Sequence, residues 1–360
     1  MGAALVEAPP PAGDARLGAA RAQVARGRAA NRARTVSVSL VLASLIAIVF
    51  CASISVGDFP IPVQDVVPAV FGFGGADSHF IVHTLRLPRA LVGLLVGGSF
   101  GLSGAIFQNL ARNPLASPDI IGVTAGATTA AVFAIVILGA GYTVVSLSAF
   151  VGALASAVAV YVLAYKRGVS SYRIVLVGIG VGAVMLAITQ YLLTRAEIFD
   201  AQRAMVWLTG SLNGRGWEHV RPLLLAGAVL VPLVLLLARP LRALQLGDET
   251  ASGLGTRVDG AKAALLLVGV GLAAVATAAA GPVVFVAFVS APIARRLTRA
   301  PGLALVPAAL VGALLLLAAD LLARRALAPT ELPVGIVTGI LGAPYLLWLL
   351  ARANRVGRGG

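Results

Sequence analysis

Long runs of apolar residues, separated by short charged segments, repeat along almost the whole chain. A helix needs roughly 20 apolar residues to cross about 30 Å of hydrocarbon, and these runs lack the alternation that barrel strands require. Because backbone polar groups must be satisfied internally in lipid, the runs predict helices. The sequence therefore predicts an all-α transmembrane bundle of about ten spans, the eighth of them short. The predicted spans are residues 36–53, 90–107, 120–140, 144–164, 174–193, 223–238, 263–280, 283–294, 303–322 and 334–350.

Composition and charge agree with a membrane protein. The chain is 59% hydrophobic and only 12% charged, which is more apolar surface than a soluble core of this size can bury. An even number of spans places both termini on one side. Most of the 28 basic residues fall on that side, which the positive-inside tendency assigns to the cytoplasm. The net charge of +14 is thus explained by topology, and nucleic acid is not an expected partner.

The chain divides into a membrane domain and two tails. Residues 1–35 are rich in Ala, Arg and Pro without an apolar face, so we expect a disordered basic cytoplasmic tail. Residues 36–351 form the ten-span domain, and residues 352–360 form a second cytoplasmic tail. Cys51 is the only cysteine, which excludes an internal disulfide and a thiolate cluster. We expect no metal site, no cofactor and no covalent chemistry in this chain.

Small residues recur at four-residue spacing inside the spans. Gly93, Gly97 and Gly101 form such a stripe in the second span, and Gly178 and Gly182 form a pair in the fifth. Small residues let helix backbones approach closely in lipid, so the stripes predict a tightly packed bundle. We also expect Gln190 and the neighbouring Gly178 and Gly182 to line a transport pathway.

The chain has no recognisable means of binding nucleotide phosphates. No G-x-x-x-x-G-K-[ST] occurs, because the only lysines are Lys166 and Lys262 and neither follows a glycine. An active transporter of this kind would draw energy from another subunit or from an ion gradient. Ion-coupled carriers usually keep ionisable residues at membrane depth. Asp320 is the main candidate, but Arg324 stands one turn later and favours a helix-surface ion pair over a proton relay.

The segment 239–262, RPLRALQLGDETASGLGTRVDGAK, interrupts the spans on the cytoplasmic side. Pro and Gly divide it into two short helical pieces, with Asp248 and Glu249 near the start of the second. We expect Leu241, Leu244 and Leu246 to form an exposed apolar ridge. Such a ridge rimmed by charge is typical of a docking surface for a protein partner.

Several motifs together resemble the permease subunit of iron-siderophore, haem and vitamin B12 ABC importers, the FecCD family. The resemblance extends over about residues 36–350 and departs at Ser290-Ala291-Pro292, where the family commonly has a histidine, so no role of that histidine is carried over. The motifs are RLPR at 86–89, RNPLASPDIIG at 112–122, the LGDETA string, GPVVFVAF at 281–288, LLLLAADLLAR ending at Arg324, and ELPVG at 331–335.

The resemblance implies a type II ABC importer permease fold in the bacterial inner membrane, with both termini cytoplasmic. It implies a dimer with a second permease chain, surrounded by membrane lipid, that passes an iron-siderophore, haem or cobalamin chelate. Arg86, Arg89 and Arg324 would receive glutamates of an extracytoplasmic substrate-binding protein. The loop at about 240–260 would sit in a groove of the ABC ATPase subunit, through Leu244, Leu246, Gly247, Asp248, Glu249, Leu254 and Gly255.

Two other functions remain open from the sequence. An ion-coupled secondary transporter would work without an ATPase and would stop when the ion gradient is lost. A structural or receptor membrane protein would not transport at all, and its deletion would leave ligand uptake unchanged.

Overall fold

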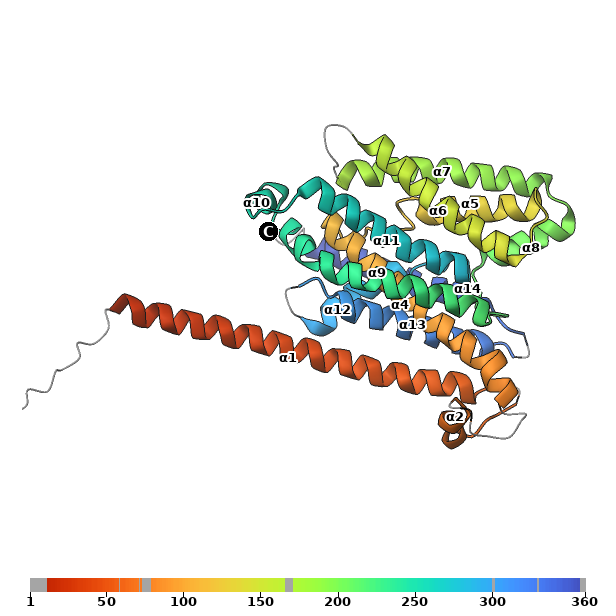
Figure 1. The fold of residues 1–360 in the computed structure, drawn as a ribbon, viewed down its shortest axis with the longest axis horizontal. Helices are drawn as coiled ribbons and strands as arrows, with labels where there is room; N and C mark the ends of the chain where they lie inside the picture. Colours follow the sequence, from red (N-terminus) through yellow and green to blue (C-terminus); the bar gives the residue numbers. More distant parts are fainter. Residues whose placement is uncertain are drawn as a thin grey trace, which may run out of the picture.

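The computed structural model describes residues 12–57, 59–70, 72, 79–165, 171–299, 302–328 and 330–356. Every regular element in this part of the chain is a helix, and the helices form one elongated bundle (Figure 1). The elements are α1 (Ala12–Ser55), α2 (Val63–Val70), the π-helical η1 (Ile81–Arg86), α4 (Leu87–Ala111), α5 (Val123–Val136), α6 (Tyr142–Ala164), α7 (Ser171–Arg195), α8 (Ile198–Leu208), α9 (Trp217–Leu244), α10 (Asp248–Gly253), α11 (Val258–Ala280), α12 (Val286–Thr298), α13 (Leu305–Arg325) and α14 (Val334–Val356).

The prediction of an all-helical transmembrane fold is confirmed. Each predicted span coincides with a helix: α1, α4, α5, α6, α7, α9, α11, α12, α13 and α14. Among the described residues, seven helical stretches are long and apolar enough to cross a membrane, whereas α5, α12 and the apolar part of α14 are shorter. The amino end of α1, the carboxyl end of α14 and α10 lie at the same end of the bundle (left in Figure 1), as an even number of spans requires.

Helix α4 occupies the centre of the bundle, in contact with α9, α11, α12 and α13. Its glycines stand where neighbouring backbones come closest. Gly97 lies against Gly312 of α13, Gly101 lies against Ala308 of the same helix, and Gly104 lies against Ala287 of α12. A Cβ atom at any of the three α4 positions would overlap backbone atoms of the neighbour. The glycine stripe therefore sets the separation of the central helices.

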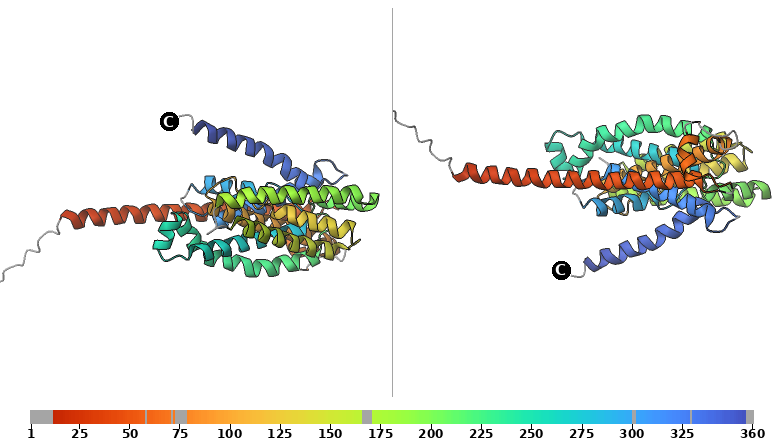
Figure 2. Two further views of the ribbon diagram at one scale, coloured as in Figure 1. Left: turned by 90° about the horizontal axis from the view of Figure 1, so that it is seen from above. Right: turned by 90° about the horizontal axis from the view of Figure 1, so that it is seen from below.

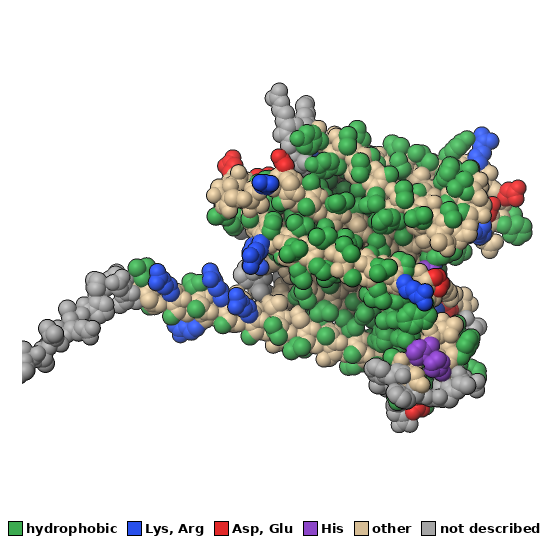
Figure 3. Space-filling model, viewed as in Figure 1, with side chains coloured by type: hydrophobic (Ala, Val, Ile, Leu, Met, Phe, Trp, Pro, Cys, Tyr) green, Lys and Arg blue, Asp and Glu red, His purple; other side chains and the backbone are tan. Residues whose placement is uncertain are grey.

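The outer surface of the bundle is apolar along the spans and charged at the ends (Figure 3). Helices α7 and α9 are the least buried of the long spans, and α14 diverges from the other helices toward its carboxyl end (Figure 2). Large apolar side chains on these helices are exposed, among them Leu176, Val184, Ile340 and Leu347. This surface is available to lipid or to another membrane subunit.

The described part of the predicted N-terminal tail is helical, so the expectation of a disordered tail over residues 1–35 is wrong from Ala12 onward. Helix α1 runs without a break from Ala12 to Ser55, and its amino end projects beyond the bundle (Figure 1). Residues 17–30 are exposed throughout. Ala, Arg and Gln have high helix propensity, and the tail extends a helix already nucleated by its span. Residues 1–11 and 357–360 lie outside the described residues.

The short eighth span follows a break in the helical path. Gly281 and Phe285 have φ values of 78° and 68°, and α12 begins after them. Pro292 lies inside α12 and cannot donate to the carbonyl of Phe288 four residues earlier. The side-chain amide of Gln108 in α4 donates to that oxygen at 2.8 Å, and its own oxygen accepts a hydrogen bond from Arg295 at 2.5 Å. Gln108 thus replaces the hydrogen bond that the proline removes.

Replacing Gly104 by valine should lower the free energy of unfolding by about 3 kcal/mol, because the new side chain would force α4 and α12 apart. Gly98→Val is the matched control, since the nearest atom to a Cβ at Gly98 is 3.8 Å away. The midpoint of thermal unfolding in detergent, followed by tryptophan fluorescence, measures both. Equal midpoints for the two variants would show that the contact with Ala287 is not restrictive.

Gln108→Leu should lower the free energy of unfolding by about 1–3 kcal/mol, because it leaves the Phe288 carbonyl without a donor. Pro292→Ala restores a backbone N–H to that carbonyl. The double variant should therefore be more stable than Gln108→Leu alone, again by thermal unfolding. A double variant less stable than Gln108→Leu would show that the Gln108 amide does not replace the backbone donor missing at Pro292.

Candidate functional site

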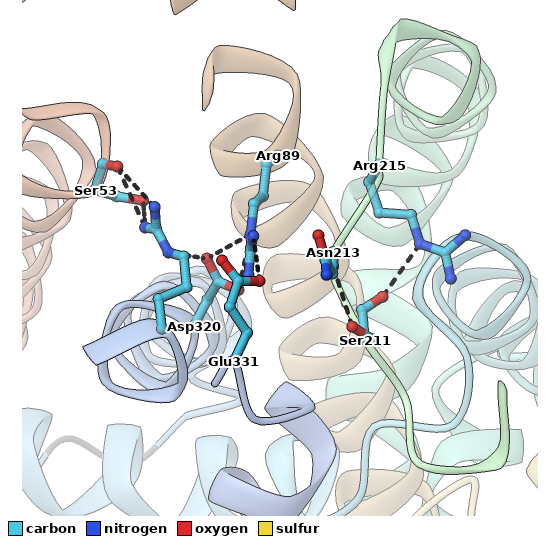
Figure 4. Close-up of polar contacts among 8 residues, drawn as sticks. Ser53, Arg89, Ser211, Asn213, Arg215, Asp320 and Glu331 are labelled. Atoms are coloured by element: carbon cyan, nitrogen blue, oxygen red, sulfur yellow. Dashed lines mark hydrogen bonds and ion pairs between the residues drawn. The ribbon is translucent and has the colours of Figure 1, made fainter. Parts of the chain in front are cut away.

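A buried carboxylate is the centre of a charge cluster at the end of the bundle opposite the termini, which we call the outer end (Figure 4). Asp320 of α13 is 2% exposed. It accepts hydrogen bonds from Nε and Nη2 of Arg89, at 3.2 and 3.0 Å, and lies 3.3 Å from Nε of Arg324. Arg89 also donates to Glu331 at 3.0 Å. A buried carboxylate requires such partners, so this outer cluster holds α4, α13 and the segment before α14 together.

Arg324 of this cluster and the neighbouring Arg86 close the carboxyl end of α1. Arg324 donates to the carbonyl of Ser53 at 3.2 Å and to its hydroxyl at 2.5 Å. Arg86 donates to the carbonyl of Ile54 at 2.7 Å and to that of Phe59 at 2.5 Å. The last carbonyls of a helix have no partner within it and carry partial negative charge, so cationic donors stabilise them.

The structure therefore places all three arginines predicted to dock a binding protein, Arg86, Arg89 and Arg324, at the outer end and gives each a partner within the chain. The predicted pair of Asp320 with Arg324 is present. The stronger bidentate contact with Arg89 was not anticipated, because no local sequence spacing connects α4 with α13. Asp320 is thus held in ion pairs with two arginines.

At the opposite end, α10 stands apart from the spans as a short helix between α9 and α11 (Figure 1). Gly247 precedes it with φ of 110°, and Gly255 follows it with φ of 82°, so glycine permits both turns. Leu246 and Leu254 flank α10 and are 63% and 65% exposed. These two leucines are the apolar contacts that the element offers to a partner.

The expectation that Leu241 and Leu244 belong to an exposed ridge is wrong. Helix α9 continues through Leu244, and the two side chains, one helical turn apart, are buried in the core, with Leu244 3% exposed. Among the predicted coupling residues, Leu244 therefore anchors the loop, while Glu249 is exposed and Asp248 half-exposed at the start of α10.

Polar contacts fix α10 to the ends of α4 and α11 that lie opposite the outer end. We call this side of the bundle the inner end. The carboxylate of Asp248 lies 2.5 Å from Nζ of Lys262 in α11 and 3.3 Å from Nη2 of Arg112, which ends α4. The amide of Gln245 donates to the side-chain oxygen of Asn109 at 2.6 Å. A displacement of α10 would therefore reach α4 directly. The contacts with Arg112 and Asn109 join residues 136 positions apart in the chain, so no local spacing predicts them.

The glycines predicted to line a pathway lie at a contact between helices, and their role in a pathway stays a prediction. A Cβ atom at Gly178 would lie 2.7 to 2.9 Å from backbone atoms of Ile121, and Gly182 faces Gly122 next to it. Both glycines therefore lie at the contact of α7 with the start of α5. Gln190 of the same helix is exposed, and its role in a pathway stays a prediction.

A cavity of about 1080 Å³ opens at the outer end and was not anticipated; we call it the outer cavity. Arg215, from the loop between α8 and α9, packs over the ring of Tyr142 at 4.5 Å from its centroid and contacts Nε2 of His219 at 3.2 Å. Burial lowers the pKa of the Arg215 guanidinium. Tyr142 and Glu218 act in the opposite direction and raise this pKa, but their effect is smaller. The wall is formed by Ile135, Tyr142, Thr143, Val145, Phe199, Gln202, Arg203, Val206, Trp207, Ser211, Asn213, Gly214, Arg215, Glu218, His219, Glu331, Leu332 and Pro333.

Comparisons with known proteins agree with this geometry. The sequence model of the FecCD transport family matches residues 45–352. The chain is 39% identical over 299 residues to the ferric enterobactin transport system permease protein FepG of Escherichia coli, covering 83% of this chain and 91% of that protein. It is 42% identical over 319 residues to the achromobactin transport system permease protein CbrC of Dickeya dadantii, covering 88% and 91%.

A solved structure has the same fold. It is described as an inward-facing conformation of a metal-chelate type ABC transporter, and it superposes with a TM-score of 0.75 at 26% sequence identity. The match covers 88% of this chain and 99% of that one.

Arg89→Ala should lower the free energy of unfolding by about 3–5 kcal/mol, because it leaves Asp320 buried with one partner fewer. Adding Asp320→Asn should recover part of this loss, since the uncompensated charge is then gone. Thermal unfolding of the two single variants and the double variant forms the cycle. Additive losses would show that the two residues are not coupled.

Proposed function

This chain belongs to the FecCD transport family, and from that premise we propose that it is the transmembrane permease subunit of an ATP-driven importer for iron-siderophore or related chelates. Its multi-pass helical fold and its relatives support a place in the bacterial inner membrane. The basic residues around the inner end support cytoplasmic termini.

The single observation that carries the proposal is the form of the inner end. Two exposed leucines flank α10, and Asp248 of α10 and Gln245 just before it bond to the ends of α4 and α11. An exposed apolar contact on a rigidly connected element is suited to receive force from a partner. We propose that a separate ABC ATPase subunit binds α10, and that closure of the ATPases on ATP moves this element and switches the side to which the pathway opens.

We further propose a second permease chain across the exposed faces of α7 and α14, since their large apolar side chains have no cover within the chain. A substrate-binding protein would dock at the outer end, over Arg86, Arg89 and Arg324. Its carboxylates would there compete with Glu331 for Arg89, while Asp320 stays buried.

An ion-coupled carrier is less well supported. Asp320, the carboxylate on which it would depend, is paired with two arginines at the outer end. Uptake into vesicles without the ATPase, abolished by collapse of the proton gradient, would favour that alternative.

Leu246→Asp combined with Leu254→Asp should detach the ATPase and abolish ATP-dependent uptake, because two charges replace the apolar contact. Co-purification with the ATPase and uptake into proteoliposomes measure the two effects. Leu17→Asp with Val24→Asp is the control, since both residues are exposed on the projecting part of α1. Retained co-purification of the Leu246/Leu254 variant would remove α10 from the coupling mechanism.

A further inference from the structure

Arg215 differs from the other cations in the wall of the outer cavity. Arg203 is paired with Asp200 at 3.2 Å, and His219 lies 3.0 Å from Glu218. In the described part of the chain, Arg215 has no carboxylate within ion-pair distance, and its Nη2 donates to no acceptor. Its Nε donates to the carbonyl of Ser211 at 3.1 Å, and its Nη1 contacts His219.

The acidic residues of the wall do not neutralise this charge. Glu331 accepts a hydrogen bond from Arg89 at 3.0 Å. Glu218 is 66% exposed and lies beside Nδ1 of His219, so water screens it. The wall therefore presents one guanidinium whose charge is not matched by a bound carboxylate.

The guanidinium is also held in place before any ligand arrives. The ring of Tyr142 lies under it at 4.5 Å, and Ser211, which accepts from Nε, is fixed by its own N–H bond to the carbonyl of Ala280 at 2.8 Å. His219 is fixed in turn, because its Nδ1 accepts the backbone N–H of Gly216 at 3.1 Å, and its Nε2 lies 3.2 Å from Nη1 of Arg215. These contacts orient the arginine and leave Nη2 for another acceptor.

We propose that the outer cavity is a subsite for the anionic oxygen groups of an incoming metal chelate, and that Arg215 is its specificity-determining residue. The Nη2 group of a charged guanidinium suits an anionic oxygen of a carboxylate or catecholate as acceptor. The volume of about 1080 Å³ is at the upper limit of ordinary ligand pockets, which hold about 300–1,000 Å³. The inference rests on the proposed importer function and names its substrate class as bulky anionic ferric chelates.

Binding can be measured on the permease–ATPase complex in lipid nanodiscs, through quenching of Trp207 in the cavity wall. The probes are a trianionic ferric tris-catecholate and an uncharged ferric tris-hydroxamate. We expect the catecholate to bind at least about tenfold more tightly. Arg215→Gln should abolish that preference by weakening catecholate binding alone, and Arg215→Lys, which keeps the charge, should retain part of it.

The matched control removes the paired cation of the same wall together with its partner, as Arg203→Gln with Asp200→Asn. It should change catecholate affinity less than about threefold. Unchanged thermal unfolding would confirm that the Arg215 variants are folded. Catecholate binding by Arg215→Gln equal to that of the unaltered protein, or equal weakening for both probes, would overturn the proposal.

Different experimental results would refute the subsite and the importer function. ATP-dependent uptake that persists while Arg215→Gln has no effect on chelate preference would refute the subsite alone. Uptake without the ATPase, with the Arg215 preference intact, would refute the importer function and leave the anionic subsite standing.

Discussion

Direct contact between helix backbones is the constraint on which the rest of the structure depends. Gly97, Gly101 and Gly104 bring α4 against α12 and α13 at distances that no side chain allows. In lipid, apolar burial between helices gives no hydrophobic gain, so packing and polar contacts must supply the association energy. The close approach also brings the Gln108 amide to the Phe288 carbonyl, which the proline of α12 leaves without a donor.

Polar residues at both ends of α4 connect this central helix to the two candidate binding sites. Helix α4 carries Arg89 in the outer cluster and Asn109 beside α10 at the inner end. One rigid helix thus connects the site where a binding protein is expected with the element where an ATPase is expected. Arginines that a family resemblance assigns to docking also hold the end of α1, so their substitution changes stability as well as binding. The Arg89 and Asp320 cycle measures the effect on stability alone.

The candidate site was predictable in part. The position of α10, the exposure of Leu246 and the arginines of the outer end follow from sequence motifs. Leu244 was placed wrongly because α9 continues through Pro240, and this further helical turn directs Leu244 into the core. The backbone contact of Gly178 with Ile121 was not predictable, because the spacing of small residues does not tell which helix they face. Arg215 received no role, since its partner Tyr142 comes from a distant helix.

Hydropathy and the positions of glycine and proline predicted the helices of the membrane domain and the break before α12, because these properties act within one helix and depend on the solvent around it. The placement of Lys and Arg indicated the orientation for the same reason. Only the tertiary structure decided which buried charge meets which partner, and which glycine faces a backbone. Such contacts join residues far apart in the chain, and local periodicity carries no information about the helix that will stand opposite.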